Sequence, residues 1–590
     1  MYLVDELIGV LSTMQSDYFQ PWLGTWPTAI DWTAAVMGTH VSAALSTISR
    51  ALDLVPVADD QCADMSRENT VTLFFSQLLG FYFGQDSFAI RNEAYDDILW
   101  VVLGWLETIR FVDLHAGVMS RKSLGNSGQG EEVKSASSLP GQQQFSEKWH
   151  GIIWNPAFAH RSRIFWNLAK TGWDSDLCGG GMVWNPTLEP YKNAITNQLF
   201  ISASTAMHVY FPGDDNQSPF STQANTSAPP GTQDVFQPRD PAFLKFAKDG
   251  YNWLQSSGMK NKQGLYIDGF HISGWSDPHN QNKKCDLRNE QVYTYNQGVI
   301  LTGLLDLWRI TGNHTYAQQG HRLVDSVVRA TGWHTKGQHP IDLDISFRVG
   351  AEQQDSWRGN KLPRWHGIGR AGVLEEFCDS RGECSQDAQT FKGIFFHHLA
   401  TFCSSSLALS DFSEDARRHI RDLHQDLEIH LRTCVGYEPW LNHNRRAMLR
   451  TRDGAGHVGT WWTAGVLGLV DRLPQDEDFA DMVNIPNAVD YRNEGVPKND
   501  PVWTRPVSPV KSPSIPNVPL PDVEHKGKIE EEEEEEEESS PSSWDLNDRG
   551  RGRTVETQGS GLALLRAHWE AHQLSERWSK GRLVVSESAN

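Results

Sequence analysis

The chain has 590 residues, of which 39% are hydrophobic and 22% charged, and this apolar content is enough for a large core and excludes a wholly disordered chain. Lysine and arginine total 53 against 74 aspartate and glutamate residues, which gives a formal net charge of -21. Such an acidic surface disfavours nucleic acid or an anionic membrane as a partner and favours a neutral or cationic ligand.

Amphipathic segments punctuated by glycine, proline and asparagine run from about residue 27 to 470, and alternating strand patterns are scarce. The pattern predicts an all-α domain of about a dozen helices. Paired helices in that number can close into a toroid whose loops gather at one mouth. In chain order, we expect helices at residues 31–50, 70–83, 96–111, 158–170, 191–210, 242–257, 292–311, 315–331, 391–410, 414–432 and 461–471.

Two polar stretches, residues 120–148 and 212–240, are predicted to be long surface insertions. The chain carries three N-x-S/T sequences, at Asn216, Asn225 and Asn313, all in polar or turn-like contexts. A glycan can be attached at each of them if the protein is secreted.

Composition changes beyond about residue 485, where a proline-rich segment precedes nine consecutive glutamates from Glu530 to Glu538. We predict that this tail is disordered. Within it, residues 558–579 form a weak amphipathic helix candidate with no sign of chemistry. The predicted organisation is therefore an N-terminal segment at 1–26, a helical toroid at 27–485 and a disordered tail at 486–590.

Seven cysteines are too few for a disulfide scaffold and lack the CxxC spacing of a zinc site. Cys378 and Cys384 can close a short loop, and the odd total leaves at least one thiol unpaired. The first residues include acidic Asp5 and Glu6, so no signal peptide is visible. There is also no apolar run of about 18 residues, and we therefore expect a soluble chain without an integral membrane segment.

The strongest catalytic candidate is the adjacent pair Asp96 and Asp97 in AYDDILWVVLGWLE, directly before an apolar helix. Neighbouring residues lie about 100° apart around a helix, so both carboxylates reach one pocket only at the helix N-terminus. There they repel each other, and one is expected to hold its proton while the other stays ionised, as glycosidases require. The alternative is that one of them only caps the helix.

A second candidate segment, residues 173–200, has Asp176 before a triple glycine that includes Gly180, and Trp184 after it. Glycines let the backbone approach a ligand, while aromatic and amide side chains offer stacking and hydrogen bonds to hydroxyl groups. These features suit a polyol. The alternative is a tight turn entering a helix, in which Asn193 and Asn197 only satisfy backbone groups.

Further segments place polar or aromatic groups at helix starts, which line the mouth of a toroid. They are GLYIDGF with Asp268, VYTYNQGV with Tyr295 and Asn296, and FKGIFFHHLA with His397 and His398. The two histidines lack an HExxH context, so we interpret them as structural rather than metal-binding.

Taken in order, these motifs resemble glycoside hydrolase family 76 of the fungal type over about residues 27–470. The resemblance is carried by AIDWTAAVMGTH, AYDDILW, DLCGGGMVWNP, YKNAITNQLF, GLYIDG, TYNQGV and FKGIFFHHL, with the Cys378 and Cys384 pair before the last. Two features depart from the family pattern: members are usually exported, and the glutamate-rich tail is not part of the family's catalytic unit.

The resemblance implies an (α/α)6 toroid and a retaining, endo-acting α-1,6-mannanase that needs no cofactor or metal. Asp96 would be the nucleophile and Asp97 the general acid and base. It also implies a mannan polysaccharide or oligosaccharide as partner, an extracellular or cell-wall location and a monomeric protein. The residues expected to bind substrate are Asp176, Gly180, Trp184, Asn193, Asn197, Asp268, Tyr295 and Asn296.

Two other functions remain open on the sequence: a transglycosylase that remodels cell-wall glycans, and a glycan-binding protein without activity. A helical prenyl-diphosphate enzyme is excluded, because its DDxxD magnesium motif would need an acid at the position of Trp100.

Overall fold

In the computed structural model of the protein, the described residues are 2–54, 61–126, 149–215, 237–342, 362–418, 420–468, 545–548 and 552–580. Long helices dominate these residues, and their strands are two or three residues long. The prediction of an all-α fold is confirmed. The predicted glycan sites Asn216 and Asn225 and the glutamate run lie outside the described residues, whereas Asn313 is described and exposed.

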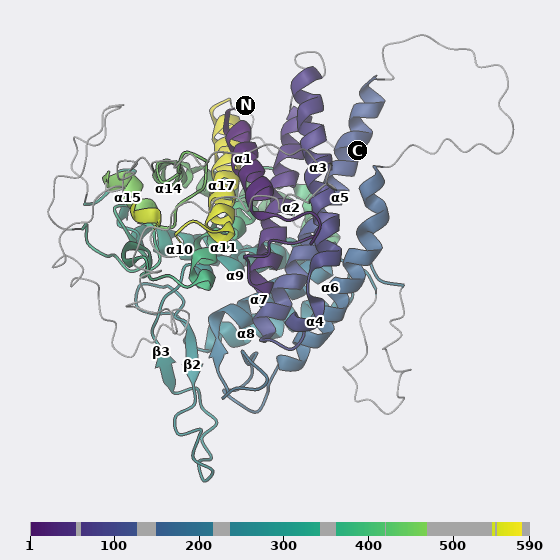
Figure 1. Ribbon diagram of the computed structural model, residues 1–590. Coiled ribbons are helices and arrows are strands. Elements are labelled where there is room, and N and C mark those ends of the chain that lie inside the picture. Colours follow the sequence, from purple (N-terminus) through teal and green to yellow (C-terminus); the bar gives the residue numbers. More distant parts are fainter. Residues whose placement is uncertain are drawn as a thin grey trace, which may run out of the picture.

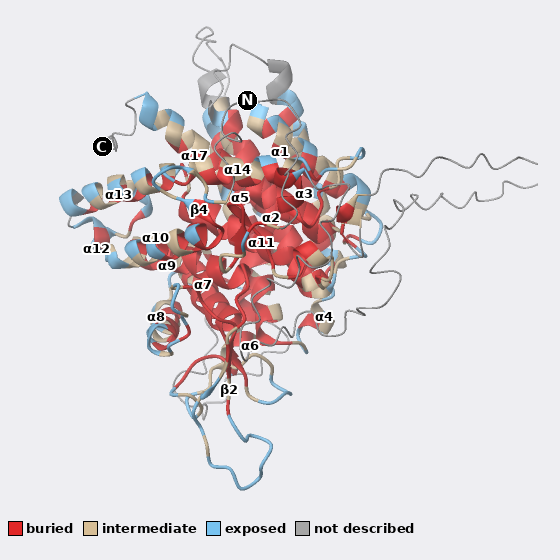
Figure 2. Cartoon of the chain, turned by 90° about the vertical axis from the view of Figure 1, so that its left-hand side faces the viewer, coloured by how far each residue is buried: buried red, intermediate tan, exposed pale blue. Residues whose placement is uncertain are grey.

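Six helices contact one another in a closed ring. In ring order, α2 packs against α5, α5 against α7, α7 against α9, α9 against α11, α11 against α17, and α17 again against α2. Buried residues concentrate on these helices (Figure 2). Their bounds are α2 Asp31–Leu54, α5 Tyr95–Asn126, α7 Ala194–Tyr210, α9 Tyr295–Thr311, α11 Gln386–Phe402 and α17 Val555–Ser579.

Other helices cover the outside of this ring. Helices α3, α6, α8 and α10 pack against α2, α5, α7 and α9 respectively, while α1, α13 and α14 pack against α17. The two layers make the toroid that the sequence predicts. The outer helices are α1 Tyr2–Thr13, α3 Gln61–Gly84, α6 Asn155–Ala169, α8 Pro241–Ser256, α10 Thr315–Ala330, α13 Ile420–Val435 and α14 Glu438–Leu449.

Short elements connect the layers. A three-stranded antiparallel sheet pairs β1 Lys192–Asn193 with β2 Gly269–His271, and β2 with β3 Leu287–Asn289. The remaining short elements are α4 Ser87–Ile90, α12 Glu414–Arg417, α15 Trp462–Leu467, β4 Trp333–His334, β5 His339–Pro340, β6 Gly369–Arg370, β7 Val373–Leu374, η1 Met14–Tyr18, η2 His150–Trp154, η3 Lys170–Gly172, η5 Asp379–Arg381, η6 Leu409–Asp411 and η9 Leu546–Asp548.

The ring and outer helices differ in sequence because they differ in burial. Helix α10 buries one stripe, with Leu323, Val324 and Val327 at the spacing of a single helix face. Helix α9 is buried at every position of its first four turns. It approaches α11 so closely that a Cβ at Gly298 would lie 2.5 Å from the Phe395 Cα, which explains the glycine.

The last ring helix comes from the segment predicted to be disordered. Helix α17 begins with Thr554, whose hydroxyl accepts a hydrogen bond from Thr557 N, and is buried almost continuously from Val555 to Ala571. The prediction of a disordered tail is therefore wrong for residues 545–548 and 552–580. Because neighbours surround α17, its sequence lacks the one-sided apolar stripe that marks a surface helix.

The N-terminal segment is also part of the toroid, since α1 packs against both α17 and α2. The two helices stand side by side although they come from opposite ends of the chain (Figure 1). The sequence did not predict α1 or α14. It also started α11 five residues late, at 391 instead of Gln386, and merged α12 with α13.

Three disulfides link loops and helix ends: Cys178 with Cys285, Cys378 with Cys384, and Cys403 with Cys434. The predicted short loop between Cys378 and Cys384 is therefore closed. None of the described helices is both long and apolar enough to cross a membrane.

Candidate active site

The ring helices α2, α11 and α17 start at the same end of the toroid. Trp32 Nε1, in the first turn of α2, donates to the Asp387 carboxylate of α11 at 2.9 Å. Glu556 of α17 accepts from both Thr33 Oγ1 and Gln386 Nε2 at 2.8 Å. These contacts bring the first turns of three ring helices together.

The starts of α5, α7 and α9 meet through the loops between them. Tyr95 N donates to Trp184 O, and Trp184 N donates to Tyr191 O, each at 2.8 Å. Asn296 of α9 reaches Asp268, the residue before β2, at 3.3 Å. We call this end of the toroid, with the first turns of the ring helices and the loops around them, the mouth. Helix α4, β2 and β3 lie at this end (Figure 1).

Asp96 and Asp97 lie in the first turn of α5 and therefore at the mouth. Asp97 Oδ2 accepts from Ala94 N at 3.2 Å, and Asp96 Oδ1 accepts from Asp97 N at 3.2 Å. Asp96 is only 3% exposed, while Asp97 is half-buried. The aspartates thus do contribute to capping α5, and the positive end of the helix dipole favours their negative charge.

More carboxyl groups surround this pair. Asp31 at the start of α2 and Glu93 before α5 share a hydrogen bond. Burial, followed by the charge of Asp31, raises the pKa of Glu93, and Asp96 adds to the rise. Burial and the charge of Asp86 raise the pKa of Asp31. The pKa values of two carboxyl groups beside the aspartate pair are thus raised by burial and mutual repulsion.

Asp268 is held in a buried polar cluster. Its Oδ2 accepts from Tyr191 Oη at 2.6 Å and from Asn289 Nδ2 at 3.3 Å, while Oδ1 accepts from Asn296 Nδ2. Tyr191 also stacks on His271 at a ring-centroid distance of 4.2 Å. The carboxylate is thus fixed in position, as a group must be if it orients a ligand.

The triple glycine turns its backbone toward a lysine. Residues 178–181 all have positive φ angles, from 58° at Cys178 to 124° at Gly180. Lys192 Nζ donates to the carbonyl oxygens of Asp174, Leu177, Gly180 and Gly181 at 2.5–3.0 Å. The loop therefore surrounds an ammonium group of its own chain.

This loop also contains two of the predicted binding residues, Gly180 and Asp176. Gly180 is buried, and a Cβ there would lie 3.2 Å from the Trp253 ring, so the glycine serves packing. Asp176 is exposed, and its backbone N–H donates to the Asp174 side chain in a turn. Trp184, in contrast, is half-buried and hydrogen-bonded through its backbone to Tyr95, next to the aspartate pair.

Asn193 and Asn197 fit the alternative in which they satisfy the backbone. Asn193 Oδ1 accepts from Thr196 N at the start of α7. The Asn197 carboxamide exchanges two hydrogen bonds with the backbone of Met182 and donates a third to Asn193 O. Both residues are almost completely buried. Their predicted contact with a ligand is not tested by this arrangement.

Tyr295 and Asn296 occupy the first turn of α9. Tyr295 is buried and stacks on Phe391 of α11 at a ring-centroid distance of 3.9 Å. Asn296 bonds with Asp268, and its backbone carbonyl accepts from Gln198 of α7. Both residues join ring helices at the mouth.

A buried carboxyl group lies at the start of α9. Glu376 accepts from Thr294 N at 2.8 Å and also from the Thr294 hydroxyl. Burial raises the pKa of Glu376 to about 8, against the opposing effect of these hydrogen bonds. Burial also raises the pKa of neighbouring Asp379 to about 6, although Asp379 pairs with Lys392. Cys378, Asp379 and Cys384 lie close enough together to hold a metal ion. The two cysteines form a disulfide, however, and are therefore not available as metal ligands.

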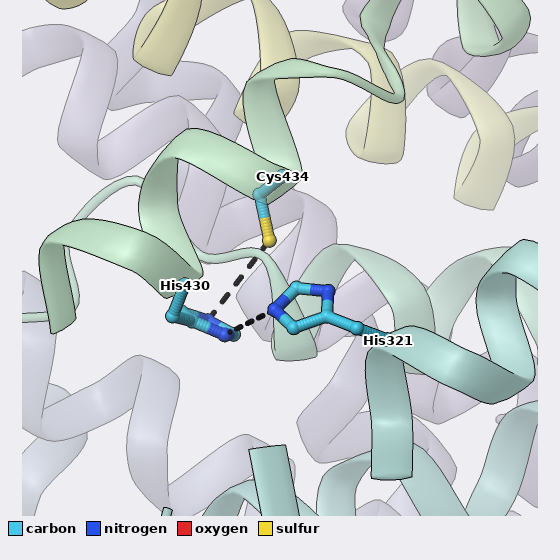
Figure 3. A group of neighbouring side chains, drawn as sticks. All are labelled: His321, His430 and Cys434. Atoms are coloured by element: carbon cyan, nitrogen blue, oxygen red, sulfur yellow. Dashed lines mark hydrogen bonds between the residues drawn. The ribbon is translucent and has the colours of Figure 1, made fainter. Parts of the chain in front are cut away.

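A second cluster with metal-ligand spacing joins His321, His430 and Cys434 (Figure 3). His430 Nε2 donates to Phe402 O at 2.9 Å, because a carbonyl can only accept. His430 is neutral, since burial lowers its pKa to about 3, so its Nδ1 accepts from His321 Nε2. His321 Nδ1 then accepts from Tyr437 Oη. Cys434 is already in a disulfide. The cluster has no free imidazole lone pair and does not fit a metal.

Several mouth residues could not be identified from the sequence. Asp31, Glu93, Asn289 and Glu556 join the site only through contacts between distant segments. The one local signal in the sequence is that Asp31 and Glu556 are acidic residues at helix starts, where negative charge is favoured.

A sequence model described as "Glycosyl hydrolase family 76" matches residues 236–358. This match includes Asp268, Asn289, Tyr295 and Asn296 of the mouth. Over these residues the chain is similar to glycosyl hydrolase family 76. The family resemblance of the sequence motifs is thereby confirmed.

Two curated relatives are both named mannan endo-1,6-alpha-mannosidase DCW1. The protein of Candida glabrata is 23% identical over 178 residues, covering 29% of this chain and 32% of the relative. The protein of Saccharomyces cerevisiae is 21% identical over 252 residues, covering 41% of this chain and 39% of the relative. The matches thus span 32% and 39% of the lengths of the two relatives, well under two thirds of either.

Solved structures are similar to the chain at low identity. An inactive variant of the α-1,6-mannanase GH76A of Salegentibacter sp. HEL1_6, in complex with α-1,6-mannotriose, is 14% identical, with a TM-score of 0.46. The similarity covers 97% of this chain and 99% of the mannanase chain. Dfg5 from Chaetomium thermophilum, in complex with glucosamine, is 14% identical with a TM-score of 0.43, covering 81% and 87%.

Proposed function

We propose that this protein is a retaining, endo-acting glycoside hydrolase that cleaves α-1,6-mannosidic linkages in mannan. The observation that carries the proposal is the pair Asp96 and Asp97 in the first turn of a ring helix, at the mouth and beside half-buried Trp184. Two neighbouring carboxylates in unequal surroundings suit a double displacement at an anomeric carbon. Such a reaction requires no metal or organic cofactor.

In the first step, the Asp96 carboxylate attacks the anomeric carbon while the bond to the leaving oxygen breaks. Asp97 donates its proton to that oxygen, and a glycosyl-enzyme ester remains on Asp96. In the second step, Asp97 takes a proton from water, whose oxygen attacks the same carbon and releases Asp96. The buried position of Asp96 and the half-buried position of Asp97 agree with these roles.

Substrate binding is proposed for mouth residues that have a fixed position. Trp184 offers an aromatic face for a sugar ring. Asp268, fixed by Tyr191, Asn289 and Asn296, is suited to orient sugar hydroxyl groups. The acidic net charge of the chain matches a neutral glycan rather than a polyanion.

The choice of α-1,6-mannan rests on the family and on the printed names of the curated relatives. Three disulfides support a location outside the cytoplasm, such as the cell wall, because such bonds persist in oxidising compartments. We also propose that the protein acts as a monomer.

The test separates the two aspartates. Asp97→Ala should lower hydrolysis of natural mannan by orders of magnitude, on the order of 10²–10⁴, because proton donation to the leaving oxygen is lost. A mannoside with an activated leaving group should still react quickly and accumulate the glycosyl-enzyme. Asp96→Ala should abolish both reactions. Asp415→Asn, on exposed α12 away from the mouth, is the control and should keep full activity.

Product analysis completes the test. Proton NMR during early turnover should show retention at the anomeric carbon. Transfer to an added mannan acceptor in preference to water would assign transglycosylation instead. Binding of mannan oligosaccharides without turnover by the unmodified protein would contradict enzymatic activity.

A further inference from the structure

The ring helices line a cavity that extends from the second turns of α2 and α5, at Val36 and Trp100, to the last turn of α7, at Tyr210. Its volume is about 30 Å³, room for roughly two water molecules or one small ion. Five ring helices contribute polar side chains, among them His40 from α2, the ion pair of Glu107 and Arg110 from α5, Tyr210 from α7, Thr302 from α9, and His397 and His398 from α11.

Three of these side chains are buried, neutral histidines. Burial, and next the charge of Arg566, lower the pKa of His40 to about 3 and that of His397 well below its usual value. His398 bonds with Thr302 Oγ1 at 2.7 Å, and His397 with Arg566 at 3.2 Å. The His40 side chain is only 2% exposed, and apart from its contact with the Gly559 backbone its ring nitrogens have no hydrogen-bond partner among the described residues.

The sixth ring helix brings a buried cation to the same place. Arg566 of α17 is 4% exposed and donates to His397 and Thr401, which both line the cavity. Its Nε–H has no partner in the described part of the chain. Three other arginines of this region each pair with a carboxylate: Arg50 with Glu570, Arg110 with Glu107, and Arg309 with Asp306.

Arg566, in contrast, forms no salt bridge with any residue that the structure describes. A charge buried in a low-dielectric interior without a counter-ion is strongly destabilising. The charged groups that act on the three histidines are Arg566 and Arg110, both cations. The carboxylates of Glu107 and Glu570 also act on Arg566, but each already pairs with another arginine, so Arg566 leaves the described charges around the cavity with one positive charge in excess.

We propose that this cavity binds a small monovalent anion such as chloride, recognised by His40 and by the uncompensated charge of Arg566. An anion there lies among side chains from α2, α9, α11 and α17. It would hold these ring helices together and would take no part in the glycan chemistry.

Thermal unfolding of the full chain tests the site. With gluconate replacing chloride at constant ionic strength, Tm should rise by about 3 °C or more as chloride is added, because an anion bound only to the folded state stabilises it. Bromide should act like chloride, and gluconate is too large for the cavity. In Arg566→Gln the rise should disappear, whereas Arg418→Gln, on the surface, should keep it.

Crystals of the unmodified protein grown in bromide give a second measurement that does not depend on a folded variant. Anomalous density inside the cavity is expected. Equal Tm in chloride and gluconate, or a bromide-containing crystal without density there, would overturn the proposal. An unchanged chloride effect in Arg566→Gln would place the anion elsewhere and overturn it as well.

Discussion

At the scale of single residues, the mouth is defined by acidic groups whose protonation depends on their neighbours. Asp97 both caps α5 and stands beside Asp96, so the capping role and the proposed catalytic role do not exclude each other. A carboxylate that bonds with backbone N–H groups at a helix start is pre-oriented without using side-chain partners. The first turn of a ring helix is therefore a suitable place for a catalytic pair.

Trp184 is expected to act in binding rather than in bond cleavage. Trp184→Ala should raise KM by roughly tenfold and lower kcat much less, because lost stacking of about 1–2 kcal/mol weakens ground state and transition state alike. Steady-state kinetics on mannan oligosaccharides measures both. Trp578→Ala, at the far end of α17, removes an exposed tryptophan without touching the mouth and should change neither. A collapse of kcat at constant KM would instead assign Trp184 to the catalytic geometry.

Glu376 makes stability depend on pH. Because its folded pKa of about 8 exceeds the usual 4.5, the folded chain binds the extra proton between these values. Stability is therefore full at low pH and decreases as pH rises toward 8. Asp379 acts in the same direction only up to about pH 6, and Lys392 opposes both.

The window between pH 6 and pH 8 thus isolates Glu376. Over it, the free energy of unfolding should fall by about 2–3 kcal/mol more in the unmodified protein than in Glu376→Gln. The amide keeps an acceptor for Thr294. Denaturant unfolding at several pH values measures the difference. Parallel pH profiles for the two proteins would show that Glu376 is ionised throughout.

At the scale of elements, the glycines in the loop between α6 and α7 have a role within the chain itself. Their positive φ angles direct carbonyl groups to the Lys192 ammonium, which is 1% exposed. The loop in turn supports Trp184 and the start of α7, so a cation of the chain itself shapes this side of the mouth.

Lys192→Met should therefore destabilise the protein by roughly 2–4 kcal/mol, since the carbonyls of Asp174 and Gly180 lose their ammonium donor in a buried site. Denaturant unfolding measures the change. The matched control is Lys245→Met, which removes an exposed ion pair with Asp249 and should cost no more than about 0.5 kcal/mol. Equal stability of the two variants would mean that water replaces the ammonium.

At the scale of the whole molecule, the two ends of the chain close the toroid together. Helix α17 completes the inner ring and α1 covers it, so residues far beyond the composition change belong to the core. Glu556 also brings a carboxylate from this last helix to the mouth. The fold and the site both depend on a segment that the composition places in a tail.

Truncation tests this dependence. Removing residues 486–590 should abolish cooperative unfolding and activity, because α17 buries several large apolar side chains worth together on the order of 10 kcal/mol. Removing only residues 581–590, which follow α17, should leave both nearly unchanged. Circular dichroism melts and mannan hydrolysis are the measurements. A shortened chain ending at 485 that melts like the full protein would remove α17 from the folding unit.

The sequence by itself determined the helical class, the positions of most helices, and the carboxylate pair at the start of a helix. These features are local: a 3.6-residue period, a helix start and a short motif are written within a few turns of chain. For the same reason the pairing of Cys378 with Cys384, only 6 residues apart, could be anticipated.

Only the tertiary structure decided which helices form the ring and which groups meet at its mouth. The bond from Thr33 to Glu556 spans 523 residues, and no local pattern marks either partner for the other. The role of α17 was hidden because a helix enclosed on all sides needs no amphipathic stripe. Likewise, Asn197 and Lys192 carry polar side chains of the kind that can bind a ligand. Only the tertiary structure shows that they form hydrogen bonds with backbone groups of the chain itself.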